Sequence, residues 1–262
     1  MTVGSLFAGI GGFDLGFERA GFEIAWQVEI DPFCHAVLER HWPDDVMRYR
    51  DVRSVHYHDS CWEDGCGQCL SPVDVVCAGF PCQPVCHHGR REGQNDERWL
   101  WPEVLRIVGE MEPGYVVLEN VPGLLYPGRG FAQILADLAS LGFDAEWECL
   151  PAIAFGASHY RERIWLVAYR PDERCDDGPS PRLYIQRPCR HDIDGCGPFT
   201  PRRNAGASAW HAYIKSNGPE PGILRAPYGL SGGVDRVFAI GNAIVPQIAE
   251  WIARQILAAE GR

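Results

Sequence analysis

The amino-acid sequence predicts an α/β protein whose mostly parallel sheet carries helices on both faces. Short, valine-rich apolar stretches alternate with longer segments whose apolar residues recur at helical spacing. Strands of a parallel sheet are buried on both sides, so they are nearly continuous apolar runs. This alternation stops between residues 171 and 235, where proline, glycine and arginine dominate. We therefore expect an α/β body, a small irregular lobe, and a final helix that returns to the body.

The first half of the body is predicted to consist of strand–helix pairs. Each strand is a short apolar run, and each helix has apolar residues three or four positions apart. Pro32 opens the second helix, since a proline at the first helical position loses no hydrogen bond. In chain order we expect strands at 3–7, 22–30 and 46–51, and helices at 13–22 and 32–42.

The second half continues the alternation. The segment WLWPEVLRIVGEM is apolar at positions i, i+3, i+4 and i+7, which indicates an amphipathic helix, and Gly142 ends the helix after it. We expect strands at 73–80, 115–121, 144–152 and 163–170, and helices at 99–111, 131–143 and 245–259. The chain then divides into a body (1–170), a lobe (171–235) and a C-terminal segment (236–262) that completes the body.

Composition and charge restrict the classes of function. The 262 residues are 46% hydrophobic, and no apolar run approaches the ~20 residues of a membrane span. The first residues lack the basic region of a signal peptide, and the eleven cysteines form no regular disulfide pattern, so we expect reduced thiols in the cytoplasm. The net charge is −11, but residues 178–236 carry eight basic and four acidic side chains, a local charge of +4. Local basicity suits a polyanion, with a solvated basic face as the alternative.

Three predicted strands end in residues suited to a nucleoside. In open α/β sheets, ligands bind beyond the carboxyl ends of the strands. The first strand ends in Gly9-Ile10-Gly11-Gly12, where a ligand could approach the backbone, although a plain tight turn is equally consistent. Glu29 and Asp51 end the next two strands, and an acid 20 residues after Gly9 suits ribose hydroxyls. Together these residues favour a nucleoside-bearing cofactor.

Two further strand ends carry a thiol and a carboxyl. Cys82 stands between two prolines in Pro81-Cys82-Gln83-Pro84, and Glu119 ends the fifth strand. A small buried hydrophobe is the structural alternative for Cys82, and a helix cap is the alternative for Glu119. If the two strands are neighbours, the thiolate could attack an electron-poor carbon while the acid protonates an adjoining ring nitrogen.

Six stretches occur in a familiar order: SLFAGIGGFDLGFERAGF, QVEID, GFPCQPVC, ENVPGLL, RERIWLVA and GNAIVPQIAEWI. In these stretches, which cover about residues 1–170 and 234–257, the chain resembles the DNA (cytosine-5)-methyltransferases. The resemblance implies a Rossmann-like, S-adenosylmethionine-dependent methyltransferase sheet with a small target-recognition lobe. The compact size and the C-terminal stretch are similar to phage or prophage members.

The resemblance also implies roles for the matching residues. Cys82 would add to C6 of a flipped-out cytosine, Glu119 would contact N3 and the exocyclic amine, and Arg161 and Arg163 would hold the base. The residues implied for S-adenosylmethionine are Phe7, Gly9, Gly11, Glu29, Ile30, Asp51, Val52, Pro81, Asn242 and Ala243. The residues implied for DNA contact are Gln83, Cys86, Arg202 and Arg203, with Cys86 at a position where the family usually has serine.

The resemblance implies that the chain binds duplex DNA as a monomer. A cognate restriction endonuclease stays open as a further partner. Two other functions stay open. The branch that methylates cytosine in tRNA uses the same cysteine and glutamate, so the motifs do not separate DNA from RNA. A non-catalytic DNA-binding relative would be expected to lack Cys82, Glu119 or the glycine loop, and all three are present.

A stretch rich in cysteine and histidine, HYHDSCWEDGCGQC (56–69), precedes the fourth strand. Cys66 and Cys69 have the spacing of a zinc knuckle, and Cys61 with His58 would complete a tetrahedral zinc site. The alternative is a surface loop with reduced thiols, because the family resemblance implies no metal.

Overall fold

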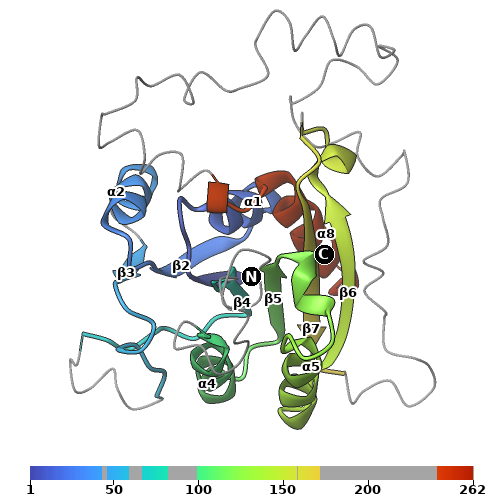
Figure 1. The fold of residues 1–262 in the computed structure, drawn as a ribbon. Helices are drawn as coiled ribbons and strands as arrows, with labels where there is room; N and C mark the ends of the chain where they lie inside the picture. Colours follow the sequence, from blue (N-terminus) through green and yellow to red (C-terminus); the bar gives the residue numbers. More distant parts are fainter. Residues whose placement is uncertain (43–45, 59–66, 82–98, 158, 172–240, 262) are drawn as a thin grey trace, which may run out of the picture.

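Seven strands form one sheet in the part of the chain that the computed structural model describes, residues 1–42, 46–58, 67–81, 99–157, 159–171 and 241–261 (Figure 1). They are β1 (Thr2–Leu6), β2 (Glu23–Val28), β3 (Met47–Tyr49), β4 (Val75–Ala78), β5 (Tyr115–Asn120), β6 (Asp144–Pro151) and β7 (Glu162–Tyr169). Their spatial order is β3-β2-β1-β4-β5-β7-β6. Strands β3 to β5 are parallel, while β7 runs antiparallel to both β5 and β6. The predicted α/β class is confirmed.

The helices of the described residues begin and end at recognisable local features. They are α1 (Gly12–Ala20), α2 (Pro32–His41), α4 (Trp101–Met111), α5 (Phe131–Ser140) and α8 (Pro246–Ala259), with 3-10 turns η2 (Pro122–Leu125) and η3 (Ala152–Phe155). Asp31 caps α2 by accepting a hydrogen bond from Cys34 N at 2.9 Å. Gly21 ends α1 with a left-handed φ of 98°. Among these described helices, none has the length and apolar character needed to cross a membrane.

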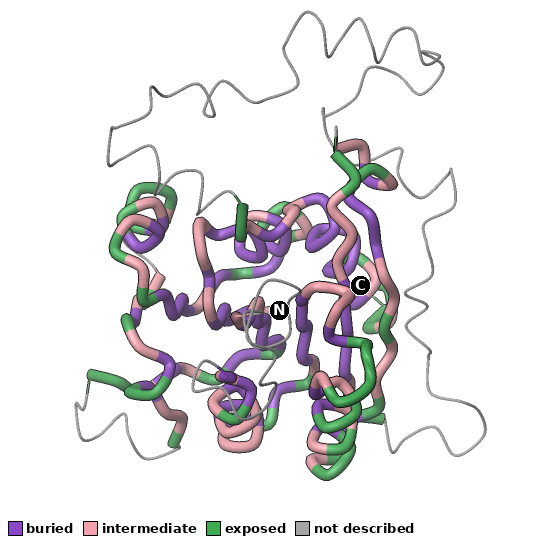
Figure 2. The backbone as a smooth tube through the Cα atoms, in the orientation of Figure 1, coloured by how far each residue is buried: buried purple, intermediate pink, exposed green. Residues whose placement is uncertain are grey.

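Alternate residues of each central strand feed two hydrophobic cores on opposite faces of the sheet. In β4, Val76 and Ala78 belong to the core covered by α4 and α5, whereas Val75 and Cys77 belong to the core covered by α1 and α8. Figure 1 shows these two helix pairs on opposite sides of the sheet, and Figure 2 shows the central strands buried along their length. Burial on both faces explains the continuous apolar runs in the sequence.

Helix α8 packs closely against α1, the helix that follows the glycine loop. A Cβ atom added to Gly16 would lie 2.5 Å from the Cβ of Ala249 and 2.6 Å from the carbonyl oxygen of Pro246. A Cβ atom added to Gly12 would lie 2.5 Å from the carbonyl oxygen of Ile244. The two glycines therefore let the C-terminal segment approach the backbone of α1 at its N-terminal end.

Replacing Gly16 by valine should destabilise the chain by about 1–3 kcal/mol or more, because the added side chain overpacks this contact. Gly109→Ala in α4 is the matched control, since its added Cβ atom would lie 3.7 Å from the Leu141 side chain, an ordinary contact. Alanine should raise stability there by ~0.5–1 kcal/mol through helix propensity. Chemical denaturation measures both effects. A wild-type denaturation midpoint for the valine variant would contradict this account of the α1–α8 contact.

Candidate active site

The carboxyl ends of β1, β2, β4 and β5 open into one cavity of about 240 Å³. Ligands of parallel sheets bind at this edge. The cavity wall consists of Phe7, Gly9, Glu29, Ile30, Asp31, Cys34, Gly79, Phe80, Pro81, Glu119, Asn120, Val121, Arg161, Arg163 and Asn242. Nine of these were predicted from the sequence as site residues, so the fold brings most of the described residues predicted for the cofactor and the cytosine into one space.

Glu29 ties the end of β2 to the loop after β1. Its Oε2 accepts a hydrogen bond from Gly9 N at 2.6 Å, and its Oε1 accepts one from Asp31 N at 2.8 Å. Burial raises the pKa of the Glu29 carboxyl, while these two N–H groups act in the opposite direction. Each oxygen of the ionised carboxyl keeps a second lone pair, so Glu29 can still accept hydrogen bonds from the hydroxyls of a ligand.

The loop after β1 has a backbone conformation that opens space beside Glu29. Phe7 has a φ of 55° and Gly9 a φ of 57°. A left-handed φ is rare for a bulky residue such as Phe7 and is characteristic of functional sites. A Cβ atom added to Gly9 would meet no described atom within 4 Å, and Ile30, 61% exposed, adds an apolar surface. A carboxylate, an open backbone and an apolar side chain fit the ribose and base of a nucleoside.

Glu119 of β5 contributes a buried carboxyl on another part of the wall. Its side chain is 9% exposed, and Arg163 Nε lies 3.2 Å from its Oε1. Burial raises the pKa of Glu119 to about 7, although the charges of Arg163 and Arg161 lower it. A carboxyl with a pKa near neutrality can both donate and accept a proton at physiological pH. Glu119 can therefore act as an acid toward a ring nitrogen.

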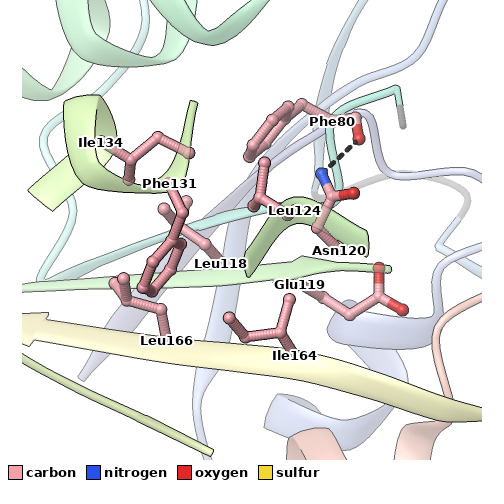
Figure 3. A pocket seen from close by; sticks show the side chains of 9 residues that line it. All are labelled: Phe80, Leu118, Glu119, Asn120, Leu124, Phe131, Ile134, Ile164 and Leu166. Atoms are coloured by element: carbon pink, nitrogen blue, oxygen red, sulfur yellow. Dashed lines mark hydrogen bonds between the residues drawn. The ribbon is translucent and has the colours of Figure 1, made fainter. Parts of the chain in front are cut away.

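Asn120, the neighbour of Glu119, fixes the turn after β4. Its Nδ2 donates a hydrogen bond to Phe80 O at 3.2 Å. In Figure 3 the Asn120 amide turns toward Phe80, whereas the Glu119 carboxyl points away from the apolar side chain of Phe131. The two adjacent residues therefore differ in what they contact. The Glu119 carboxyl faces the 240 Å³ cavity, whereas the Asn120 amide holds Phe80, and with it Pro81, beside β5.

Arg161, just before β7, anchors the segment that precedes α8. Its Nη1 donates to Gly241 O at 2.5 Å, and its Nη2 donates to Ala243 O at 2.7 Å. These carbonyls lie on either side of Asn242, which lines the cavity. Arg161 therefore holds Asn242 at the cavity wall, a contact that the sequence motif did not reveal. Ala243, a predicted cofactor residue, is engaged through its carbonyl and is not part of the wall.

Three other predicted cofactor residues also lie away from the wall. Asp51 pairs with Arg53, with 2.7 Å between Oδ2 and Nη2, and this hydrogen bonding lowers the pKa of Asp51. Val52 is buried in the core under α4. A Cβ atom added to Gly11 would lie 2.5 Å from Trp42. The cofactor contacts assigned to Asp51, Val52 and Gly11 stay predictions.

Several predicted site residues lie outside the described residues: Cys61, Cys66, Cys82, Gln83, Cys86, Arg202 and Arg203. Almost all of the lobe at 171–235 does so as well. Of the predicted zinc ligands, His58 and Cys69 are described, and the described part of the chain holds no group of three His, Cys, Asp or Glu side chains that could bind a metal ion. The zinc site and the lobe stay predictions.

Asp31, Cys34 and Asn120 line the cavity but were not predicted as site residues. Asp31 could have been found, since an aspartate before Pro32 is a typical helix start at the end of a strand. Cys34 gave no such indication. Burial raises the pKa of Cys34 to about 12, with the charges of Glu29 and Asp31 acting in the same direction. Its thiol therefore stays protonated and is no nucleophile.

Comparisons with known proteins identify relatives of the whole body. The family model for C-5 cytosine-specific DNA methylase matches residues 1–193. The type II methyltransferase M.BsuFI of Bacillus subtilis is 35% identical over 185 residues, covering 70% of this chain and 42% of that protein. M.NgoMIV of Neisseria gonorrhoeae is 35% identical over 165 residues, covering 62% and 50%. The chain spans about half the length of the curated relatives that it matches.

Solved structures share the fold. A protein described as a DNA modification methyltransferase encoded within a prophage (E. coli) matches with a TM-score of 0.53 at 25% identity, over 65% of this chain and 47% of that one. A mutant of Spodoptera frugiperda DNMT2 matches with a TM-score of 0.59 over 100% of this chain and 99% of that one. Its identity is 17%, so this second likeness shows the fold alone.

Proposed function

The chain belongs to the C-5 cytosine-specific DNA methylase family, and from this premise we propose that it transfers a methyl group from S-adenosylmethionine to C5 of cytosine in duplex DNA. The type II methyltransferase relatives support this reaction. One observation carries the proposal. Residues predicted for the cofactor (Gly9, Glu29, Asn242) and for the cytosine (Glu119, Arg163) line the same cavity. A methyl donor and its acceptor must meet in one space.

We assign the activation of cytosine to Cys82 and Glu119. Cytosine C5 is a weak nucleophile, so the Cys82 thiolate adds to C6 and forms a carbon–sulfur bond. Protonated Glu119 gives its proton to N3, and the electron pair of the former 5,6 double bond then makes C5 an enamine-like nucleophile. Arg163, 3.2 Å from the Glu119 carboxyl, orients that group. The base must first leave the helix, which costs a few kcal/mol of unstacking.

S-adenosylmethionine, when bound, supplies an electrophilic methyl group for C5. Glu29 would hold the ribose hydroxyls, and Gly9 and Ile30 would border the nucleoside. Once C5 carries the methyl group, Glu119 takes the N3 proton back. Loss of the C5 proton to a base then restores the 5,6 double bond, breaks the carbon–sulfur bond and regenerates the Cys82 thiolate. This route needs no metal ion.

We assign target recognition to the lobe at 171–235, with Arg202 and Arg203 contacting DNA. Its basic excess suits a phosphate backbone. The type II relatives support a cognate restriction endonuclease as a partner and the bacterial cytoplasm as the location, and the prophage-encoded neighbour supports a phage origin.

The test of this function is methyl transfer by the purified full chain. Tritium-labelled S-adenosylmethionine is incubated with mixed-sequence duplex DNA or with tRNA, and the labelled base is identified after hydrolysis. We expect label in DNA as 5-methylcytosine. Label confined to tRNA would favour the RNA alternative over this proposal, and a label on adenine or on neither substrate would contradict it.

Replacing Arg161 by alanine should weaken cofactor binding about as much as Asn242→Ala does. Losing the hydrogen bonds to Gly241 and Ala243 frees the turn that holds Asn242, and losing one cofactor hydrogen bond costs ~1–2 kcal/mol. Calorimetric titration with S-adenosylhomocysteine measures both variants. If Arg161 instead acts only on the flipped base, its variant will bind the cofactor normally and lose affinity for DNA.

A further inference from the structure

A buried polar pair lies beneath the loop that follows β1. Asp14, in the first turn of α1, is 1% exposed. Ser5 of β1 is also 1% exposed, and its hydroxyl donates a hydrogen bond to Asp14 Oδ1 at 2.8 Å. Ser5 precedes the loop at 7–11 and Asp14 follows it. The hydrogen bond therefore closes this loop at its base.

Two more polar side chains lie beside this pair, one on each of the next two strands of the sheet. Gln27 of β2 stands opposite Ser5, and Arg48 of β3 stands opposite Gln27. The Gln27 side chain is fully buried and faces the Asp14 carboxyl, and its Oε1 accepts a hydrogen bond from Arg48 Nε at 3.2 Å. Because Arg48 takes the Gln27 oxygen, the Gln27 NH₂ group is the part available to Asp14. Ser5, Asp14, Gln27 and Arg48 are called the loop-base cluster below.

The loop-base cluster underlies the cofactor part of the cavity. Gln27 is two residues before Glu29, whose carboxylate accepts the hydrogen bond from Gly9 N at 2.6 Å. Glu29 and Asp14 therefore hold the same loop from two sides, Glu29 at the cavity wall and Asp14 from the interior. A shift of the loop would move Gly9 and Phe7, which both line the cavity.

A carboxyl at this place is unfavourable for stability. Burial raises the pKa of Asp14 to about 6, despite hydrogen bonding to Gln27 and Ser5, so at neutral pH the group is mostly ionised inside the protein. Within the described residues its Oδ2 has no hydrogen-bond partner of good geometry. Buried charges without full pairing lower stability, and such exceptions are expected mainly at functional sites. Packing alone would be better served by an apolar residue.

We propose that Asp14 is a positioning residue that, through Ser5 and Gln27, holds the loop at 7–11 in the conformation that binds S-adenosylmethionine. The inference rests on the proposed function only for the identity of the cofactor. The carboxylate suits this place because both of its oxygens are acceptors: Oδ1 accepts from Ser5, and the NH₂ group of Gln27 faces the same carboxyl. An asparagine that kept its oxygen on Ser5 would turn its NH₂ group toward the NH₂ group of Gln27, and two donors cannot bond each other.

The test compares cofactor affinity with stability in the full chain. Asp14→Asn should weaken S-adenosylhomocysteine binding roughly tenfold in calorimetric titration, the loss of about one charge-assisted hydrogen bond. Its stability to denaturant at pH 8 should equal or exceed that of the wild type, because a buried charge is gone. A residue with a merely structural role would change both quantities in the same direction.

Two further variants sharpen the result. Ser5→Ala should weaken binding similarly, because it removes the hydrogen bond to Asp14 Oδ1 that closes the loop at its base. The matched control is Asp137→Asn. Asp137 lies in α5, on the opposite face of the sheet, and its carboxylate accepts a hydrogen bond from Trp101 Nε1 at 2.8 Å. This variant should retain wild-type affinity.

The outcomes separate the two proposals. Wild-type affinity in both Asp14→Asn and Ser5→Ala would overturn the positioning role, as would parallel losses of affinity and stability in Asp14→Asn. A wild-type chain that binds no S-adenosylhomocysteine would instead overturn the cofactor assignment of the proposed function.

Discussion

Cys82→Ser should abolish the covalent adduct that we expect the wild-type chain to form with duplex DNA containing 5-fluorocytosine. Fluorine at C5 cannot leave as a proton does, so the elimination that frees the thiolate stops and the carbon–sulfur bond survives denaturation. A serine hydroxyl stays protonated at neutral pH and is a poor nucleophile without an activating base. Methyl transfer to ordinary DNA should fall on the order of 10³-fold or more, as for other lost nucleophiles.

Denaturing gel electrophoresis of labelled DNA measures the adduct, and the target sequence need not be known if mixed-sequence DNA is used. Cys149→Ser is the matched control, because Cys149 is a partly buried thiol of β6 that does not line the cavity. The control should form the adduct in wild-type yield. An equal yield from Cys82→Ser would exclude Cys82 as the nucleophile.

The types and the order of the elements were predictable from the sequence, because burial on both faces gives each strand of the body its apolar run. The predicted helix at 245–259 begins one residue before the observed Pro246–Ala259. The insertion of β7 between β5 and β6, antiparallel to both, was not predictable. An apolar run such as Ile164–Ala168 reads the same in either strand direction, so it carries no information on pairing.

The residues of the candidate site were predictable where a reactive or charged side chain lies at the end of an apolar strand. Glu29 and Glu119 each end an apolar strand, and parallel strands bring such ends together at one edge. The contacts of Arg161 were not predictable, since its partners Gly241 and Ala243 are 80 and 82 residues away. Asp14 sits in an amphipathic helix pattern, where an acid is expected to face solvent. Asp14 is buried because it faces Ser5 of β1 and Gln27 of β2, a tertiary contact between α1 and the sheet.

Glu119→Gln should lower the rate of methyl transfer by ~10²–10⁴-fold, the usual contribution of a general acid. Glutamine keeps the shape of the side chain but has no carboxyl proton to transfer to N3. Cofactor affinity should change little, because Glu119 makes no contact with Glu29 or the glycine loop among the interactions of the described residues. Titration with S-adenosylhomocysteine verifies this, and single-turnover kinetics on DNA measures the rate.

The pH dependence gives Glu119 a second test with a defined sign. Its folded pKa of about 7 lies above the ordinary value of 4.5, so the folded chain holds this proton more tightly than the unfolded chain. The wild type therefore loses stability as the pH rises from about 4.5 to 7, by ~3 kcal/mol in total from this group. Glu119→Gln should not show this loss. The stability of the variant minus that of the wild type should therefore be larger at pH 8 than at pH 4.

The rate of methyl transfer should depend on pH through the same carboxyl proton of Glu119. In the proposed mechanism the protonated carboxyl of Glu119 is the active form, so kcat/KM of the wild type should fall as the pH rises through about 7 in the free enzyme. Since Arg163 lowers the pKa of Glu119, Arg163→Ala should move this falling limb to higher pH as well as weaken base binding. A limb that stays in place in Arg163→Ala, or a pH-independent rate in the wild type, would mean that Glu119 is not the acid that protonates N3.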